Sequence, residues 1–165
     1  MYYPTPFTSE STSYGSRNEP AAKNKYLQRF PERHIHNCGV LLQPRLPFLG
    51  ATPDGIVCDS KNHDIGLLEV KCPFTARDMT VKEAALSLKN FYVVETNDSL
   101  TISKSHNCYY QIQGQLLLSG LEFCDFVLNT TKDMFIERVY RDSGFINQIV
   151  DKLFTFQKKY YLSEI

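Results

Sequence analysis

Long apolar runs are absent from the sequence, and none approaches the roughly 20 residues that a membrane-spanning helix needs. The first 16 residues, MYYPTPFTSESTSYGS, also lack the charged and apolar segments of a secretory signal peptide. We therefore expect no membrane partner and no secretion. The protein is expected inside the cell, in the nucleus if its source is eukaryotic and in the cytoplasm otherwise.

An excess of charge of one sign is absent as well. The chain carries 18 basic and 18 acidic residues, so its formal net charge is zero. This balance is not typical of a non-specific nucleic-acid binder, and DNA contact would have to come from local basic patches and a bound metal. Lys23, Lys25, Arg29 and Arg33 form one such cluster; an ordinary solvated helix face explains the same pattern.

The five cysteines contain no Cys-x-x-Cys pair. An odd, scattered set of this kind favours reduced thiols and argues against an iron–sulfur cluster, which four clustered cysteines would hold. His34, His36 and Cys38 alternate as metal ligands on a strand would, but no partner pair follows them downstream. We therefore predict no zinc site.

The sequence does contain material for a core, because 42% of its 165 residues are hydrophobic. That amount fits one globular domain, and the order of periodic segments supports an α/β or α+β class. Residues 1–14 show neither the helical nor the strand periodicity of apolar residues and are expected to be a disordered lead. Outside the central stretch described next, helices are predicted over 16–30, 75–88, 108–117 and 143–162, and strands over 39–42, 91–95, 100–102, 124–130 and 134–140. The 91–102 hairpin is expected either to contact DNA or a partner, or to cover the core.

The central stretch runs from Leu49 to Lys71. Apolar residues on both sides of a polar turn at 59–64 predict two antiparallel strands, with Asp54 entering the first and Glu69 and Lys71 near the end of the second. Side chains alternate along a strand, so Glu69 and Lys71 share one face while Val70 points to the other. Two carboxylates and an ammonium group can thus share one pocket.

This trio suits a metal-dependent phosphodiesterase. Neighbouring carboxylates repel unless a cation lies between them, and hard oxygen ligands favour Mg²⁺ or Mn²⁺. A metal held there activates a bound water, and a lysine can orient that water and offset phosphorane charge. Taken singly, Pro-Asp-Gly is a common turn and Glu-x-Lys a common surface pattern. Their combination on one hairpin, with Glu-x-Lys inside an apolar strand, favours the active-site interpretation.

Two motifs on this stretch, Gly50–Gly55 (GATPDG) and Leu68–Pro73 (LEVKCP), resemble the YqaJ-type viral recombinases. These are relatives of phage lambda exonuclease within the PD-(D/E)xK nuclease superfamily. The resemblance extends from about Gly15 to the C-terminus. It implies an α/β fold with a restriction-endonuclease-like core, in which helices flank a mixed central β-sheet.

The resemblance also assigns roles to residues. It implies that Asp54, Glu69 and the Val70 carbonyl bind Mg²⁺ or Mn²⁺ and that Lys71 positions the attacking water. The segment Gly15–Ala21 (GSRNEPA) resembles the helix whose glutamate faces the metal, which would make Glu19 a ligand; a capping role for Glu19 fits the Ser-x-x-Glu spacing equally.

A second helix segment carries glutamines. Tyr109–Leu116 (YYQIQGQL) resembles the family's tyrosine and glutamine helix, so Gln111 is expected to bind the scissile phosphate or a metal-bound water. Solvent-facing glutamines are the structural alternative. We further expect Lys23, Arg29 and Gln115 to contact DNA.

The function predicted from these residues is a metal-dependent DNA exonuclease of the recombination type that acts on duplex ends. An endonuclease using the same site, and a nuclease-derived DNA-binding module that does not cut, are the alternatives. By resemblance, a ring-shaped homotrimer and a single-strand annealing protein are expected partners. Residues 15–165 are expected to form the nuclease domain, without the N-terminal helices that family members carry upstream.

Overall fold

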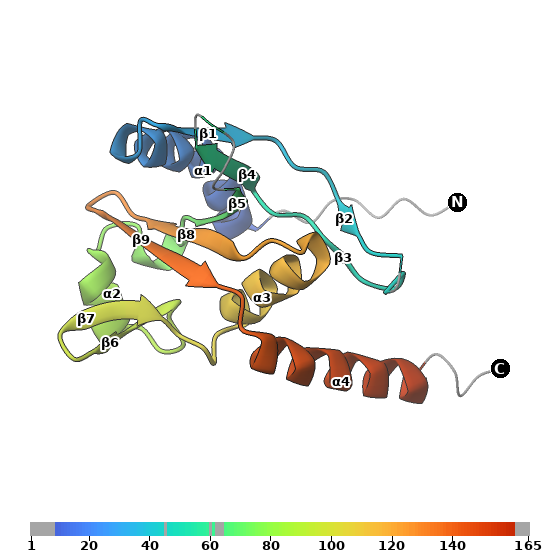
Figure 1. The fold of residues 1–165 in the computed structure, drawn as a ribbon. Coiled ribbons are helices and arrows are strands. Elements are labelled where there is room, and N and C mark those ends of the chain that lie inside the picture. The colour runs from blue at the N-terminus through green and yellow to red at the C-terminus, as the bar shows by residue number, and fades with distance from the viewer. Residues whose placement is uncertain (1–8, 45, 60, 62–64, 161–165) are drawn as a thin grey trace, which may run out of the picture.

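The computed structural model describes residues 9–44, 46–59, 61 and 65–160. Its main feature is a five-stranded sheet in the order β1-β4-β5-β8-β9, in which β5 and β8 run parallel and the other neighbours antiparallel. Helices lie on both faces of this sheet (Figure 1). The predicted fold class, an α/β domain with a mixed sheet flanked by helices, is confirmed. The sheet strands are β1 (Arg33–His36), β4 (Gly55–Asp59), β5 (Gly66–Lys71), β8 (Phe123–Asn129) and β9 (Met134–Tyr140).

The predicted central hairpin is formed by β4 and β5, with Gly55 opposite Leu68 and Val57 opposite Gly66. The Asp54 amide continues this pairing, since it donates to the Leu68 carbonyl at 3.1 Å. The hairpin prediction is confirmed, although residues 60 and 62–64 of its turn lie outside the described residues. Asp54 is therefore held at the end of β4 that adjoins the last residues of β5.

The two faces of β5 belong to different parts of the core. Leu68 and Val70 pack with Ala22 and Tyr26 of helix α1 (Glu10–Arg29). Leu67, on the other face, belongs to the cluster built on α2 (Val81–Ser87) and α3 (Asn107–Ser119). Strand alternation therefore directs Glu69 and Lys71 towards α3, as their spacing predicts.

Helix α1 begins six residues earlier than the sequence predicts. Its N-cap is Ser9, whose hydroxyl accepts a hydrogen bond from the Thr12 amide, so the predicted cap at Ser16 is wrong. Several serines and threonines in this stretch could cap a helix, and the local pattern does not distinguish them. Residues 10–14 are helical instead of disordered, while residues 1–8 of the predicted lead lie outside the described part.

Two further boundaries also differ. Thr75 lies in the short 3-10 helix η1 (Phe74–Ala76), and α2 begins only after Thr80, which forms a reciprocal capping box with Glu83. The predicted start of this helix at Thr75 is therefore wrong. Strand β1 was not predicted, because a four-residue edge strand with one apolar residue shows little periodicity without its partner β4.

The second predicted hairpin is present as β6 (Val93–Thr96) and β7 (Ser99–Ile102), joined through Asn97 and Asp98, which both have positive φ. Such a turn matches the twist of a hairpin. Val93 and Ile102 are buried, so the hairpin covers the core. The short strands β2 (Leu41–Leu42) and β3 (Gly50–Ala51) form a separate two-stranded ladder.

The last helix, α4 (Ser143–Tyr160), extends from the end of β9 alongside α3 (Figure 1). It confirms the predicted helix, of which residues 161–162 lie outside the described part. No helix among the described residues is long and apolar enough to span a bilayer. All five cysteines are free thiols.

Candidate active site

The hairpin places Asp54, Glu69 and Lys71 together. The Lys71 Nζ donates to Glu69 Oε1 at 2.5 Å, and the Val70 amide donates to Asp54 Oδ2 at 2.7 Å. Strand alternation accounts for the first contact and the adjacency of β4 and β5 for the second. The three side chains that the sequence grouped are thus brought to one end of the hairpin.

Glu69 is a buried carboxylate, with only 1% of its surface exposed. Two amides of α3 reach it from one helical turn apart: Gln111 Nε2 donates to Oε1 at 2.7 Å, and Gln115 Nε2 donates to Oε2 at 2.8 Å. A buried charge is tolerated when donors surround it. Helix α3 therefore fixes the orientation of this carboxylate.

Helix α1 supplies a third acidic residue. Glu19 accepts from Lys23 Nζ at 2.6 Å, and the same ammonium group donates to the Asp54 carbonyl at 2.6 Å. Glu19 and Asp54 line one pocket of about 460 Å³ together with Lys71. Glu19 thus faces the site instead of capping its helix, which is the orientation that the resemblance implied.

The electrostatics of the pocket are unusual for Asp54. Burial, followed by the negative charge of Glu69, raises the pKa of Asp54 to about 6, although the Val70 hydrogen bond lowers it and the Glu19 charge raises it further. For Lys71, burial alone lowers the pKa, but the charge and hydrogen bond of Glu69 outweigh it and the net pKa is raised. Lys71 is therefore an ammonium group at neutral pH.

These residues fit a divalent cation by the chemistry of their donors. Three carboxylates, from Glu19, Asp54 and Glu69, converge, and burial together with the charges of the other two raises the pKa of Asp54. Two of them already have an ammonium partner: Lys23 binds Glu19 at 2.6 Å and Lys71 binds Glu69 at 2.5 Å. Within the described part of the chain, no group of three or more acidic, histidine or cysteine side chains is arranged to hold a metal ion as it stands. Binding a cation would therefore require the lysines to give way.

Two residues predicted to contact DNA do not line this pocket. Gln115 is 1% exposed and donates to Glu69, so in this structure its amide serves the carboxylate, and its DNA contact stays a prediction. Arg29 is exposed but follows Glu19 by ten residues of α1, roughly 15 Å along the helix axis, and lines a different cavity with Arg33 and Arg138. Lys23 lies beside the site, where its ammonium group binds Glu19 and the Asp54 carbonyl.

The pocket also includes residues that sequence reasoning missed. The first turns of α1 contribute Ser11, Thr12 and Ser16, and Thr75 and Tyr92 close the opposite side. Because α1 begins at Glu10, the hydroxyls of Ser11 and Thr12 lie on its first turn beside the pocket. The sequence signal for this early start was Ser9 as the N-cap residue, which the prediction missed. Tyr92 precedes β6 and carried no local signal.

Known proteins share both the sequence pattern and the fold of this chain. The family model described as the YqaJ-like viral recombinase domain matches residues 3–122. No curated protein matches the sequence. The structure is similar to the alkaline exonuclease LHK-Exo from Laribacter hongkongensis, with 25% identity and a TM-score of 0.68 over 94% of this chain and 71% of that one. A second structure, LHK-Exo in complex with dAMP, gives 24% identity and a TM-score of 0.69 over 94% and 70% of the two chains.

Proposed function

Because this chain belongs to the family of the YqaJ-like viral recombinase domain, we propose that it is a divalent-metal-dependent exonuclease that hydrolyses DNA from duplex ends. The family and the likeness to an alkaline exonuclease make it a DNA nuclease. The metal requirement and the preference for ends are the proposed part. The observation that carries the proposal is the buried Glu69, organised by one lysine and two glutamines beside the destabilised carboxylate of Asp54.

In this proposal Glu19, Asp54 and Glu69 hold Mg²⁺ or Mn²⁺ with the Val70 carbonyl. The bound ion would supply a hydroxide-like nucleophile at neutral pH and would offset charge on the phosphate. Asp54 must be deprotonated to act as a ligand, and the low cost of removing a proton with a pKa of about 6 makes it available at neutral pH.

The protein's own cationic and amide groups complete the site. Lys71, which stays protonated, orients the attacking water and stabilises the negative charge that develops on the phosphate. Gln111 is exposed and still reaches Glu69, so its amide can exchange that contact for a phosphate oxygen. Gln115, in contrast, is a positioning residue that acts through Glu69.

The test is cleavage of an end-labelled linear duplex beside a closed circular plasmid, with Mg²⁺ or with EDTA. Wild type is compared with Lys71→Ala and with a matched control, Lys89→Ala, which removes an exposed lysine that follows α2. We expect Mg²⁺-dependent loss of the linear DNA alone, abolished by Lys71→Ala and unchanged by Lys89→Ala.

The other outcomes are equally informative. Nicking of the circle would make the protein an endonuclease that uses the same site. Retention of labelled DNA by a folded wild type that never cuts would identify a binding module. A homotrimer and an annealing partner, which the family resemblance implies, remain predictions that sedimentation velocity and co-purification would test.

A further inference from the structure

We propose that Tyr92 is the stacking platform of a nucleobase subsite: it holds one unpaired base of the strand being cut, in the pocket beside Lys71. This inference rests on the proposed function and adds to it the part of the substrate that the pocket recognises. Nucleobases present aromatic faces whatever their sequence, so such a platform binds without sequence preference.

The first argument is the position of the ring. Tyr92 lines the same pocket as Asp54 and Lys71, so a base on the ring and a phosphate at the carboxylates would lie within one cavity. The pocket volume of about 460 Å³ lies in the range of roughly 300–1,000 Å³ that is typical of small-molecule sites. The charge of Lys71 also acts on Tyr92, opposing the burial that raises the pKa of the phenol.

The second argument is that the Tyr92 ring is held in a fixed position at the wall of this pocket. The other aromatic lining residue, Phe74, has the Arg77 guanidinium 4.1 Å from its ring centroid and the Tyr14 ring centroid at 5.6 Å. Tyr92 is half-buried, and its ring packs against those of His106 and Phe91, with ring centroids 4.6 Å and 5.5 Å away. A ring fixed in this way loses little conformational freedom when a ligand binds.

The third argument concerns polar groups. Among the described residues, the Tyr92 hydroxyl makes no hydrogen bond, so this hydroxyl is not needed for an internal contact. The hydroxyls of Ser16 and Thr75 in the same pocket likewise have no hydrogen-bond partner within the described ranges. They are available for the sugar and phosphate of a nucleotide whose base lies on the ring.

The competing explanation is that Tyr92 only supports the N-terminus of α3 through His106. Removal of the ring would then lower stability and activity together, and the presence of a base in the substrate would not matter. The two explanations therefore differ in their response to a substrate that lacks one base.

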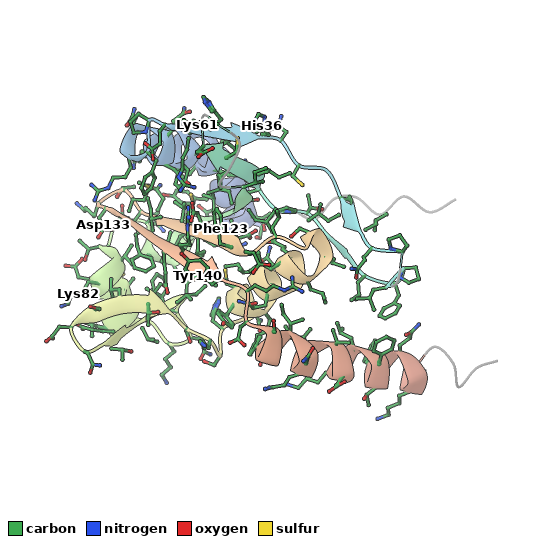
Figure 2. All side chains as sticks on the ribbon, in the orientation of Figure 1. His36, Lys61, Lys82, Phe123, Asp133 and Tyr140 are labelled. Carbon is green, nitrogen blue, oxygen red and sulfur yellow. The ribbon has the colours of Figure 1, made fainter. Side chains whose placement is uncertain are left out.

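The experiment measures kcat/KM on linear duplexes that are intact or carry one abasic nucleotide, stepped through the first positions from the labelled end. The variants are Tyr92→Ala, Tyr92→Phe and Tyr92→Trp, with Tyr140→Ala as matched control because Tyr140 is an exposed tyrosine at the end of β9, outside the pocket (Figure 2). Tyr92→Leu keeps apolar volume without a π-face and replaces the alanine variant if that variant fails to fold.

We expect Tyr92→Ala to lose roughly 5- to 150-fold in kcat/KM, the equivalent of stacking one base, while the Phe and Trp variants stay close to wild type. At one position, an abasic nucleotide should lower the kcat/KM of wild type by a similar factor. The same abasic nucleotide should not lower the kcat/KM of Tyr92→Ala below its value on the intact duplex. Equal losses in Tyr92→Ala and Tyr140→Ala, a loss in Tyr92→Phe as large as in Tyr92→Ala, or indifference of wild type to the abasic site would overturn the inference.

A binding readout separates this inference from the proposed function. A fluorescent purine analogue at the sensitive position should lose intensity on binding to wild type in EDTA and should keep it with Tyr92→Ala. Wild type that never cleaves refutes the exonuclease proposal, whereas cleavage without any dependence on the base or on Tyr92 refutes only the subsite.

Discussion

Replacing Asp54 by asparagine should make the metal-free protein more stable while it abolishes cleavage. The substitution removes a negative charge that is destabilised first by burial and then by repulsion from Glu69 and Glu19, and the asparagine oxygen can still accept the Val70 amide hydrogen bond. A residue that destabilises the fold in exchange for a ligand position is expected at an active site.

The magnitude follows from the pKa of Asp54, which is about 6 in the folded chain against an ordinary value of 3.8. This difference corresponds to roughly 3 kcal/mol at about 1.4 kcal/mol per tenfold change, and solvent screening of a half-buried group reduces it to about 1–2 kcal/mol. For a chain of this length that is a rise of about 2–8 °C in Tm.

The sign depends on pH. Because the folded pKa lies above the unfolded one, wild type loses stability as the pH rises through about 6, and it loses none of this contribution below about pH 4, where the carboxyl is neutral in both states. The advantage of Asp54→Asn should therefore be full at pH 8 and should vanish towards pH 4.

The assay is thermal unfolding in EDTA from pH 4 to pH 8, beside Asp151→Asn, which makes the same change at an exposed position on α4. We expect a pH-dependent difference for Asp54→Asn only. Mg²⁺ should then raise the Tm of wild type and not that of Asp54→Asn. An Asp54→Asn protein that is less stable than wild type at pH 8, or a gain that does not change with pH, would refute the like-charge argument.

Three further predictions concern other contacts. Gln111→Ala should lower kcat about 10- to 150-fold, the equivalent of one hydrogen bond to a charged group, with a smaller fall in Tm than Gln115→Ala, because Gln111 is exposed and water can replace its amide whereas Gln115 is buried. Steady-state kinetics and calorimetry on the same preparations test this. Gly66→Ala should destabilise the fold by about 1–3 kcal/mol or more in urea unfolding, since its Cβ would meet the buried Phe123 ring at 2.1 Å. Asp125→Ala should cost about 3–5 kcal/mol in the same assay, because it removes the buried partner of two arginines.

The central hairpin was predictable because its signals are local. The turn, the apolar runs and the Glu-x-Lys spacing all lie within Leu49–Lys71, and strand alternation then decides which side chains share a face. The resemblance placed Gln111 at the site but did not predict its hydrogen bond to Glu69, since helical periodicity does not say which strand a helix meets.

The surroundings of the predicted DNA contacts were not predictable in the same way. Helical spacing puts Gln115 one turn from Gln111 but does not show that its side chain is buried against Glu69 of β5. Arg29 was grouped with Lys23 by sequence distance, although it lines a different cavity beside β9. Both outcomes depend on how helices are placed on the sheet, which is a property of tertiary packing.

The burial of Phe123 shows how that packing is enforced. Its ring lies at the start of β8, near the centre of the molecule in Figure 2, with the Arg138 guanidinium 3.7 Å above it and Gly66 of β5 beneath. Only a residue without a side chain at position 66 permits this contact. A sequence pattern shows the glycine but not the ring that requires it.

The order of the chain has a consequence for the timing of assembly. Glu69 is synthesised before the groups that organise it: Gln115 follows 46 residues later, and β8, its parallel neighbour strand, later still. At about 5–20 residues per second, seconds pass between the synthesis of Glu69 and that of Gln115. The hydrogen bond that orients this carboxylate therefore cannot form until α3 has been synthesised, so the order of Glu69 is a property of the completed fold and not of the hairpin alone.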